Sequence, residues 1–193
     1  MSLHAAADFF ARVRAGILGP DLSGQEVEGC NAILAAMDGL PAAYVAYALG
    51  TAYHETNATL QPVREAYWLS EAWRKKNLRY WPWYGRGYVQ ITWEANYRKA
   101  DAKLGLKGSL IANPDRAMEP EIAAGVMRAG MVEGWFAGDK GGRHTLARHL
   151  PAEIATLDQF RSARRIINGI DDDLLIARHA LQFQAALIAG RWS

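Results

Sequence analysis

The chain has 193 residues, half of them hydrophobic, and a net charge of +2 at pH 7. This length suits one domain with its own core, and the small charge does not by itself indicate a nucleic-acid partner. The single cysteine excludes an intrachain disulfide, and no apolar run approaches the roughly 18 residues of a membrane span.

Three helices are predicted in the amino-terminal part of the chain. Hydrophobic residues at steps of four predict the first within residues 4–18, before a Gly-Pro pair. Ser23 and Glu26 have the form of a capping box, and an apolar stripe that includes Cys30 predicts a second helix after them. A third, rich in alanine, is expected over residues 42–55.

The end of the third helix predicts a special setting for Glu55. The negative end of a helix dipole disfavours a carboxylate, and partial burial acts in the same direction. Both favour the protonated side chain that a general acid needs.

The next segment concentrates aromatic side chains beside carboxylates. Ten of the fifteen Trp and Tyr residues lie between Tyr67 and Tyr97, close to Glu65 and Glu71. Aromatic planes cover the apolar faces of sugar rings, and carboxylates pass protons to and from a glycosidic oxygen and a water. The composition therefore favours a polysaccharide cleft.

Most of these aromatic side chains are nevertheless expected in the core, Trp73 and Trp93 among them, and only two or three against sugar. A basic run follows Glu71, namely Arg74, Lys75, Lys76 and Arg79. It is either a solvated face or a contact with an anionic cell wall.

The rest of the chain reads as mainly α. We expect a short helix near residues 68–73, a structured loop over 81–87, a short strand or extended wall over 88–93, helices over 94–104, 119–136 and 157–167, a flexible loop over 138–142, and a final helix that begins at residue 171.

Several kinds of catalytic site are excluded by spacing. A zinc-protease motif needs a second histidine four residues after His54, where the chain has Ala58. No other metal-ligand spacing, serine-nucleophile elbow or catalytic-cysteine signature is present. We therefore expect no metal and no cofactor.

Four motifs, in this order, resemble glycoside hydrolase family 19, which holds plant-type chitinases and a branch of phage and prophage endolysins. They are His54-Glu55-Thr56, the block from Tyr84 to Trp93 with Asn96-Tyr97, the Asn113-Pro-Asp115 turn before a helix that ends in Trp135-Phe136, and Arg165-Ile-Ile-Asn-Gly169. The short spacing from His-Glu-Thr to Gln61-Pro-Val-Arg-Glu65 is similar to the endolysin branch.

The resemblance implies one catalytic domain over residues 1–193, with residues 1–40 as helices packed on a lysozyme-like, two-lobed helical fold. It implies an inverting endo-glycosidase that cuts β-1,4 bonds of peptidoglycan. Chitin is the alternative substrate, and a wall-binding module without catalysis is the alternative from another class.

The resemblance also assigns roles to single residues. Glu55 matches the general acid, Glu65 the general base with Glu71 as its rival, and Thr92 the hydroxyl that holds the attacking water. We assign substrate binding to His54, Tyr84, Arg86, Gln90, Asn96, Tyr97 and Asn168.

Two arginine sites are expected to pair with carboxylates. A buried guanidinium usually has such a partner, and a catalytic glutamate is a candidate partner for Arg86. Arg164 and Arg165 have either the same role or a surface role.

The expected partner is a polysaccharide, with no nucleic acid, no membrane and a monomeric state. The first residues lack the basic and apolar regions of a signal peptide. We therefore expect a chain that is cytoplasmic as made and reaches the wall after holin-dependent release or lysis.

Overall fold

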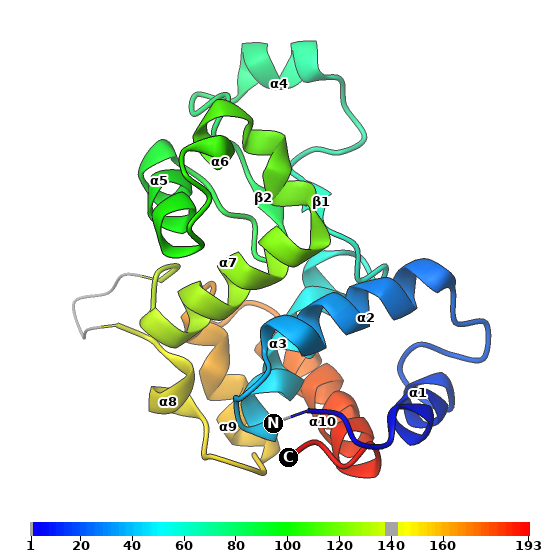
Figure 1. The fold of residues 1–193 in the computed structure, drawn as a ribbon. Helices are drawn as coiled ribbons and strands as arrows, with labels where there is room; N and C mark the ends of the chain where they lie inside the picture. The colour runs from blue at the N-terminus through cyan, green and yellow to red at the C-terminus, as the bar shows by residue number, and fades with distance from the viewer. Residues whose placement is uncertain (1, 138–142) are drawn as a thin grey trace.

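The computed structural model describes residues 2–137 and 143–193, which are mainly helical, as predicted (Figure 1). The α-helices are α1 (Ala6–Arg14), α2 (Gly24–Ala36), α3 (Ala42–Glu55), α4 (Glu71–Asn77), α5 (Glu94–Lys103), α6 (Ser109–Ala112), α7 (Pro120–Glu133), α8 (Leu146–His149), α9 (Leu157–Ala163) and α10 (Asp173–Ala189). The 3-10 helices are η1 (Pro114–Met118) and η2 (Arg164–Ile166). Strands β1 (Val63–Arg64) and β2 (Arg86–Gly87) pair antiparallel, with Val63 opposite Gly87 and Arg64 opposite Arg86.

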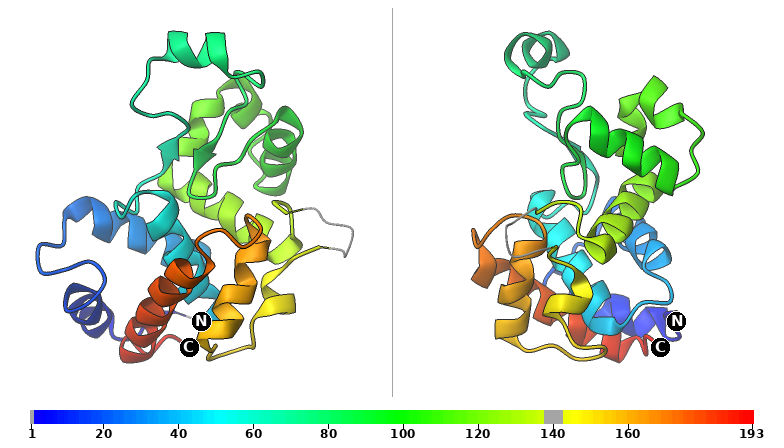
Figure 2. Two further views of the ribbon diagram at one scale, coloured as in Figure 1. Left: turned by 180° about the vertical axis from the view of Figure 1, so that it is seen from behind. Right: turned by 90° about the vertical axis from the view of Figure 1, so that its left-hand side faces the viewer.

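The elements form two groups, which we call the lower and upper lobes after their places in Figure 1. The upper lobe holds β1, α4, β2, α5, α6 and η1, and the lower lobe holds α1, α3, α8, α9, η2 and α10. Helices α2 and α7 pack on each other between the lobes. Helix α7 also contacts η1 and β2 above and α8 below. In both views of Figure 2, α4 (teal) lies at the outer end of the upper lobe.

Helix α3 is the central helix of the lower lobe and has the predicted bounds. Its residues 45–52 are all buried, and it packs along α10. A Cβ atom at Gly50 would lie 2.7 Å from the backbone nitrogen of Ala180, so glycine is needed for this close helix contact. The packing fixes the carboxyl end of α3, where Glu55 lies.

The amino-terminal helices pack on this core. The capping box of α2 is confirmed, because Ser23 Oγ accepts from the Glu26 amide and Glu26 Oε2 accepts from the Ser23 amide at 2.7 Å. Cys30 is buried, and burial raises the pKa of its thiol to about 12, so it is an inert core residue. Helix α1 is shorter than the predicted 4–18 and contacts α10.

The middle of the chain differs most from prediction. The expected strand over residues 88–93 is absent from the structure, since the sheet lies at β2 and only an isolated bridge joins Arg86 to Ile91. Gln90 and Trp93 have φ angles of 52° and 72°, which a strand does not allow. The short helix begins later than expected, with the Ser70 hydroxyl accepting from the Trp73 amide as its cap.

The later helices follow the prediction with shorter bounds. Helix α7 ends before Gly134, which is left-handed at φ 69°, and the helix predicted over residues 157–167 is divided into α9 and η2. The flexible loop predicted over residues 138–142 lies outside the described residues.

Among residues 2–137 and 143–193, none of the helices has both the length and the apolar character needed to cross a membrane.

Candidate active site

Glu55, the last residue of α3, is held by a buried arginine from the other end of the chain. Arg164 of η2 donates from Nη1 to Glu55 Oε1 at 2.8 Å. The exposed fraction is 4% for the Arg164 side chain and 20% for that of Glu55. Arg164 and Arg165 were left between pairing with a glutamate and a surface role. Arg164 makes such a pair, and Arg165 is exposed.

The segment between η2 and α10 contacts both Arg164 and the end of α3. The Arg164 Nε atom donates to the Asp171 carbonyl at 2.8 Å. His54 Nε2 lies 3.4 Å from a carboxylate oxygen of Asp172, the residue before α10. The end of α3 is therefore joined to this segment by two adjacent side chains, His54 and Glu55.

Glu65 follows β1 directly and is held by uncharged donors. Its Oε2 accepts from the Gly85 amide at 3.0 Å, and its Oε1 accepts from the Tyr80 hydroxyl at 2.7 Å. The hydrogen bond to Glu65 raises the pKa of Tyr80 to about 12, and burial adds to this effect. The phenol therefore stays protonated at neutral pH and donates to the carboxylate.

Gly85 makes room for Glu65 and Gln90. A Cβ atom at Gly85 would lie 2.7 Å from Gln90 Oε1 and 3.3 Å from Glu65 Oε2. The Gln90 amide nitrogen donates to the Val63 carbonyl at 3.0 Å and to the Gly87 carbonyl at 3.1 Å. The glycine thus places two predicted site residues, a carboxylate and an amide, beside the same backbone position.

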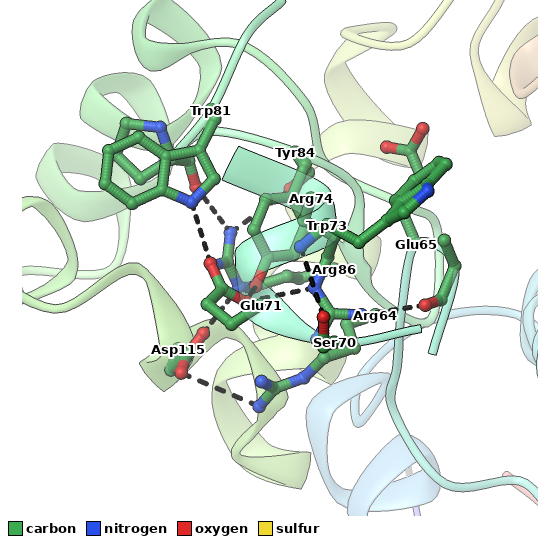
Figure 3. A network of polar contacts seen from close by, with 12 residues as sticks. Arg64, Glu65, Ser70, Glu71, Trp73, Arg74, Trp81, Tyr84, Arg86 and Asp115 are labelled. Atoms are coloured by element: carbon green, nitrogen blue, oxygen red, sulfur yellow. Dashed lines mark hydrogen bonds and ion pairs between the residues drawn. The ribbon is translucent and has the colours of Figure 1, made fainter. Parts of the chain in front are cut away.

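Glu71, the predicted rival of Glu65, lies within a ring of donors (Figure 3). Its carboxylate accepts from Trp81 Nε1 at 2.7 Å, Tyr84 Oη at 2.8 Å and Arg74 Nε at 3.0 Å. Burial raises the pKa of Glu71, but these hydrogen bonds outweigh burial and lower it to about 2. Glu71 is therefore an ionised structural group at neutral pH.

Arg86 pairs with an aspartate rather than with a catalytic glutamate, which corrects the prediction. Its Nε donates to Asp115 Oδ1 at 2.8 Å, and its Nη1 donates to the Tyr97 hydroxyl at 3.0 Å. The Tyr97 hydroxyl donates to the Tyr84 carbonyl at 2.8 Å. Arg64 also reaches Asp115, at 3.6 Å, so Asp115 joins β1 and β2 to η1 (Figure 3).

Three residues that were assigned to substrate binding, Tyr84, Arg86 and Tyr97, are buried. Tyr84 and Tyr97 have no exposed surface, and Arg86 is 3% exposed. They support the loop that carries Gly85, because Arg86 and Tyr97 both donate to the Tyr84 carbonyl.

The other predicted site residues are accessible. Thr92 is half-buried and donates from Oγ1 to the Gln90 carbonyl at 2.9 Å, while Asn96 donates to the Thr92 carbonyl at 2.8 Å. Asn168 is exposed in the segment that joins η2 to α10. His54 is half-buried beside Glu55.

The two tryptophans that were expected in the core are both on the surface. Trp73 is 38% exposed and Trp93 is 47% exposed. Trp93 packs against Tyr80, with ring centroids 5.0 Å apart, and so lies next to the residue that donates to Glu65.

Two contributors to the site were missed by reasoning from the sequence. Tyr80 carried no signal beyond its place in the aromatic cluster, and Asp115 was considered only as part of a turn. Arg164 was left between two roles, because two arginines lie between the apolar Ala163 and Ile166 and the sequence does not show which is buried; in the structure it is Arg164.

Within the described residues, no group of three or more His, Cys, Asp or Glu side chains is arranged to hold a metal ion.

The site thus offers two carboxylates in different settings. Glu55 lies in the lower lobe at the end of α3, and Glu65 lies in the upper lobe after β1. One is paired with a cation, and the other has only uncharged donors among its described hydrogen-bond partners.

Comparison with known proteins identifies the fold of the chain. No family model matches the chain, and no curated protein matches it. Among solved structures, chitinase C from Streptomyces griseus HUT6037 has a TM-score of 0.63 and 20% identity, over 96% of this chain and 76% of that chain. A mutant of chitinase C has a TM-score of 0.63 and 19% identity, over 96% and 93%.

A bacterial family 19 chitinase has a TM-score of 0.57 and 18% identity, over 96% of this chain and 95% of that chain. The chain has the fold of family 19 chitinases. The predicted fold class, a two-lobed helical fold with at most a short β element, is therefore confirmed.

Proposed function

We propose that the chain is an inverting endo-glycosidase that hydrolyses β-1,4 bonds of bacterial peptidoglycan. The observation that carries the proposal is the Glu55–Arg164 pair at the end of α3, in a fold shared over 96% of the chain with family 19 chitinases. Glu65, held at the edge of the other lobe, supplies the second carboxylate.

Glu55 acts as the general acid. Its proton goes to the glycosidic oxygen as the bond from that oxygen to the anomeric carbon breaks. Glu55 then carries a negative charge, and the guanidinium of Arg164 at 2.8 Å stabilises it. The pair therefore favours the state that forms when the leaving group departs.

Glu65 acts as the general base. A carboxylate has about four acceptor positions, and its described hydrogen bonds to Tyr80 and Gly85 use two of them. A water bound at a remaining position gives its proton to Glu65 and attacks the anomeric carbon from the face opposite the leaving oxygen. Such a water requires the two carboxyl groups to be about 6.5–9.5 Å apart.

Glu71 is the weaker candidate for the base. Its carboxylate accepts three hydrogen bonds, and its pKa of about 2 makes it a poor proton acceptor at neutral pH. We therefore assign the base to Glu65, with Thr92 as the hydroxyl that orients the water and Gln90, Asn96 and Asn168 as sugar contacts.

Two other functions remain candidates. Hydrolysis of chitin is favoured by the names of the structural neighbours, which are chitinases. A wall-binding module without catalysis would keep the fold but lack a competent base. Access to the wall through a holin or on lysis stays a prediction, as do the endolysin assignment and the monomeric state.

The test is the release of reducing ends from purified peptidoglycan and from chitin by the wild type and three variants. We expect Glu55→Gln to lower the rate by about 10³-fold and Glu65→Gln by about 10²-fold, while Glu71→Gln retains most activity. Full activity in Glu55→Gln would overturn the proposal. Faster turnover of chitin than of peptidoglycan would change the substrate, and wall binding without reducing ends would favour the binding module.

A further inference from the structure

The exposed aromatic side chains of the protein gather in one segment. Within the described residues, the large aromatics with the highest exposure are Tyr67 (58%), Trp68 (71%), Trp73 (38%), Trp81 (37%) and Trp93 (47%). Four of them lie in α4 or within four residues of its ends, and α4 forms the outer end of the upper lobe (Figures 1 and 2). Trp93 precedes α5 and contacts this segment through Arg79 and Tyr80. An exposed aromatic cluster of this kind marks a binding surface more often than a chance arrangement.

Cations accompany these rings. The Lys75 ammonium lies 5.0 Å from the centre of the Trp81 ring, and the Arg79 guanidinium lies 5.2 Å from that of Trp93. Lys76 is also exposed. Lys75 and Arg79 thus lie over ring faces. We call the exposed aromatic and basic residues of this segment the α4 patch, namely Tyr67, Trp68, Trp73, Lys75, Lys76, Arg79, Trp81 and Trp93.

The positive charge of the α4 patch is not balanced by nearby acids. In the part of the chain that the structure describes, no ion pair involves Lys75, Lys76 or Arg79. Glu71, the acid on the same helix, is paired with the buried Arg74. Three cations therefore face solvent without a carboxylate partner.

The helix dipole explains only part of this arrangement. Cations near the carboxyl end of a helix are favourable, and this accounts for lysines in the last turn of α4. It does not account for the indole and phenol rings that are exposed beside them, because each ring would be more stable when buried. A ligand with both apolar faces and negative charge fits both features.

We propose that the α4 patch binds peptidoglycan beside the hydrolytic site, which it adjoins at Trp93 and Tyr80, with Lys75, Lys76 and Arg79 facing carboxylates of the stem peptides and Trp68 packing on a sugar or peptide face. The choice of partner rests on the proposed function. Peptidoglycan carries carboxylates on its peptides, whereas chitin is neutral. The patch would therefore make the protein prefer the anionic polymer.

The test is co-sedimentation with purified sacculi from which phosphate-containing wall polymers have been removed. It uses the 193-residue chain with Glu55→Gln, so that binding is measured without hydrolysis. Adding Lys75→Gln and Lys76→Gln is expected to weaken binding about tenfold at about 0.05 M salt, and by less than about twofold at about 0.5 M salt, where charges are screened. Trp68→Ala is expected to weaken binding at both salt concentrations.

Two control variants test whether weaker binding is specific to Lys75 and Lys76. Lys75→Arg with Lys76→Arg keeps both charges and should bind as the parent does. Arg14→Gln with Lys107→Gln removes two exposed charges from α1 and from the loop after α5, and should also bind as the parent does. If this second pair weakens binding as much as the lysine pair, the effect is one of net charge and the proposal is wrong.

A third arm identifies the anion. Converting the carboxylates of the sacculi to amides should weaken binding of the parent protein as much as removing both lysines does. Unchanged binding to amidated sacculi, or binding that requires the phosphate polymers, would overturn the proposal. Binding is measured without catalysis, so the two proposals can fail separately. Full activity of Glu55→Gln would contradict the proposed function, whereas the binding results alone decide whether the α4 patch binds peptidoglycan.

Discussion

The two lobes hold their candidate catalytic carboxylates in different ways. Glu55 in the lower lobe is paired with Arg164, which lies 109 residues further along the chain. Glu65 in the upper lobe accepts hydrogen bonds from Tyr80 and Gly85, which lie only 15 and 20 residues away. The lower site therefore depends on tertiary packing of α3, η2 and α10, and the upper site depends on one local loop.

The difference is consistent with the roles of acid and base proposed for Glu55 and Glu65. A group that gives up a proton becomes negative, and a cation beside it stabilises that product. A group that takes a proton from water needs free acceptor positions, and the two described hydrogen bonds of Glu65 leave such positions on its carboxylate. Glu71 is the useful contrast, because three donors that include Arg74 lower its pKa to about 2.

The largest expected effect comes from breaking the long-range pair in the lower lobe. Arg164→Met leaves Glu55 partly buried without its cation and removes the donor to the Asp171 carbonyl. We expect a loss of about 2–3 kcal/mol in the free energy of unfolding, measured in urea, and a loss of activity of at least about 10²-fold. Arg164→Lys keeps the charge and should lose less stability. Equal stability of wild type and Arg164→Met would contradict the importance of the pair.

Gly85→Ala should disturb the upper lobe site. The new Cβ would lie 2.7 Å from Gln90 Oε1 and 3.3 Å from Glu65 Oε2, so both side chains must move. Activity is expected to fall about 10- to 100-fold, because a base displaced by about an ångström loses its alignment with the water, while the melting temperature changes little. The matched control is Gly24→Ala, where the added Cβ meets no atom within 4 Å. If Gly85→Ala and Gly24→Ala have the same activity, the Gly85 contact does not position the base.

As the pH falls, we expect the lower lobe to lose stability before the upper lobe does. Burial, followed by the charges of His144, Arg148 and Arg165, lowers the pKa of His149 from 6.5 to about 4. The unfolded chain then binds more protons than the folded chain between these values, so stability falls as the pH drops from about 6.5 to about 4. His149→Gln should reduce this loss by about 1 kcal/mol after allowance for solvent screening.

Hydrogen exchange of α8 and α9 against pH is the measurement, with α4 as the internal reference. Wild-type protein should lose protection in α8 and α9 first. Simultaneous loss of protection in all three helices would show that His149 does not set the order.

The smallest effect is expected for Glu71→Gln. The pKa of Glu71 is lowered from 4.5 to about 2, so its contribution to stability is present above about pH 4.5 and is lost as the pH falls through about 2. Because about half of this side chain is exposed, the contribution at neutral pH is no more than about 1 kcal/mol. Urea unfolding at pH 7 and at pH 3 should give a smaller pH difference for the variant than for the wild type.

The sequence predicted those elements that depend on residues close together in the chain. The bounds of α3 and the capping box of α2 follow from residue types within a few positions of each other.

Contacts between distant segments could not be predicted in this way. The partners Glu55 and Arg164, and Arg86 and Asp115, are 109 and 29 residues apart, and no periodicity connects them. Trp73 and Trp93 were wrongly expected in the core because aromatic residues usually are buried, and the side of α4 that faces the rest of the protein is set by tertiary packing. The short strand or extended wall predicted over residues 88–93 was wrong because the backbone turns at Gln90 and Trp93.

The most direct test of two carboxylates acting as acid and base is the configuration of the first product. Proton NMR during hydrolysis of a soluble β-1,4-linked oligosaccharide reports which anomer of the new reducing end forms before mutarotation. Attack by a water on the face opposite the leaving oxygen predicts that the α-anomer forms first. Initial formation of the β-anomer would contradict the account, because it would mean that one carboxylate attacks the sugar itself.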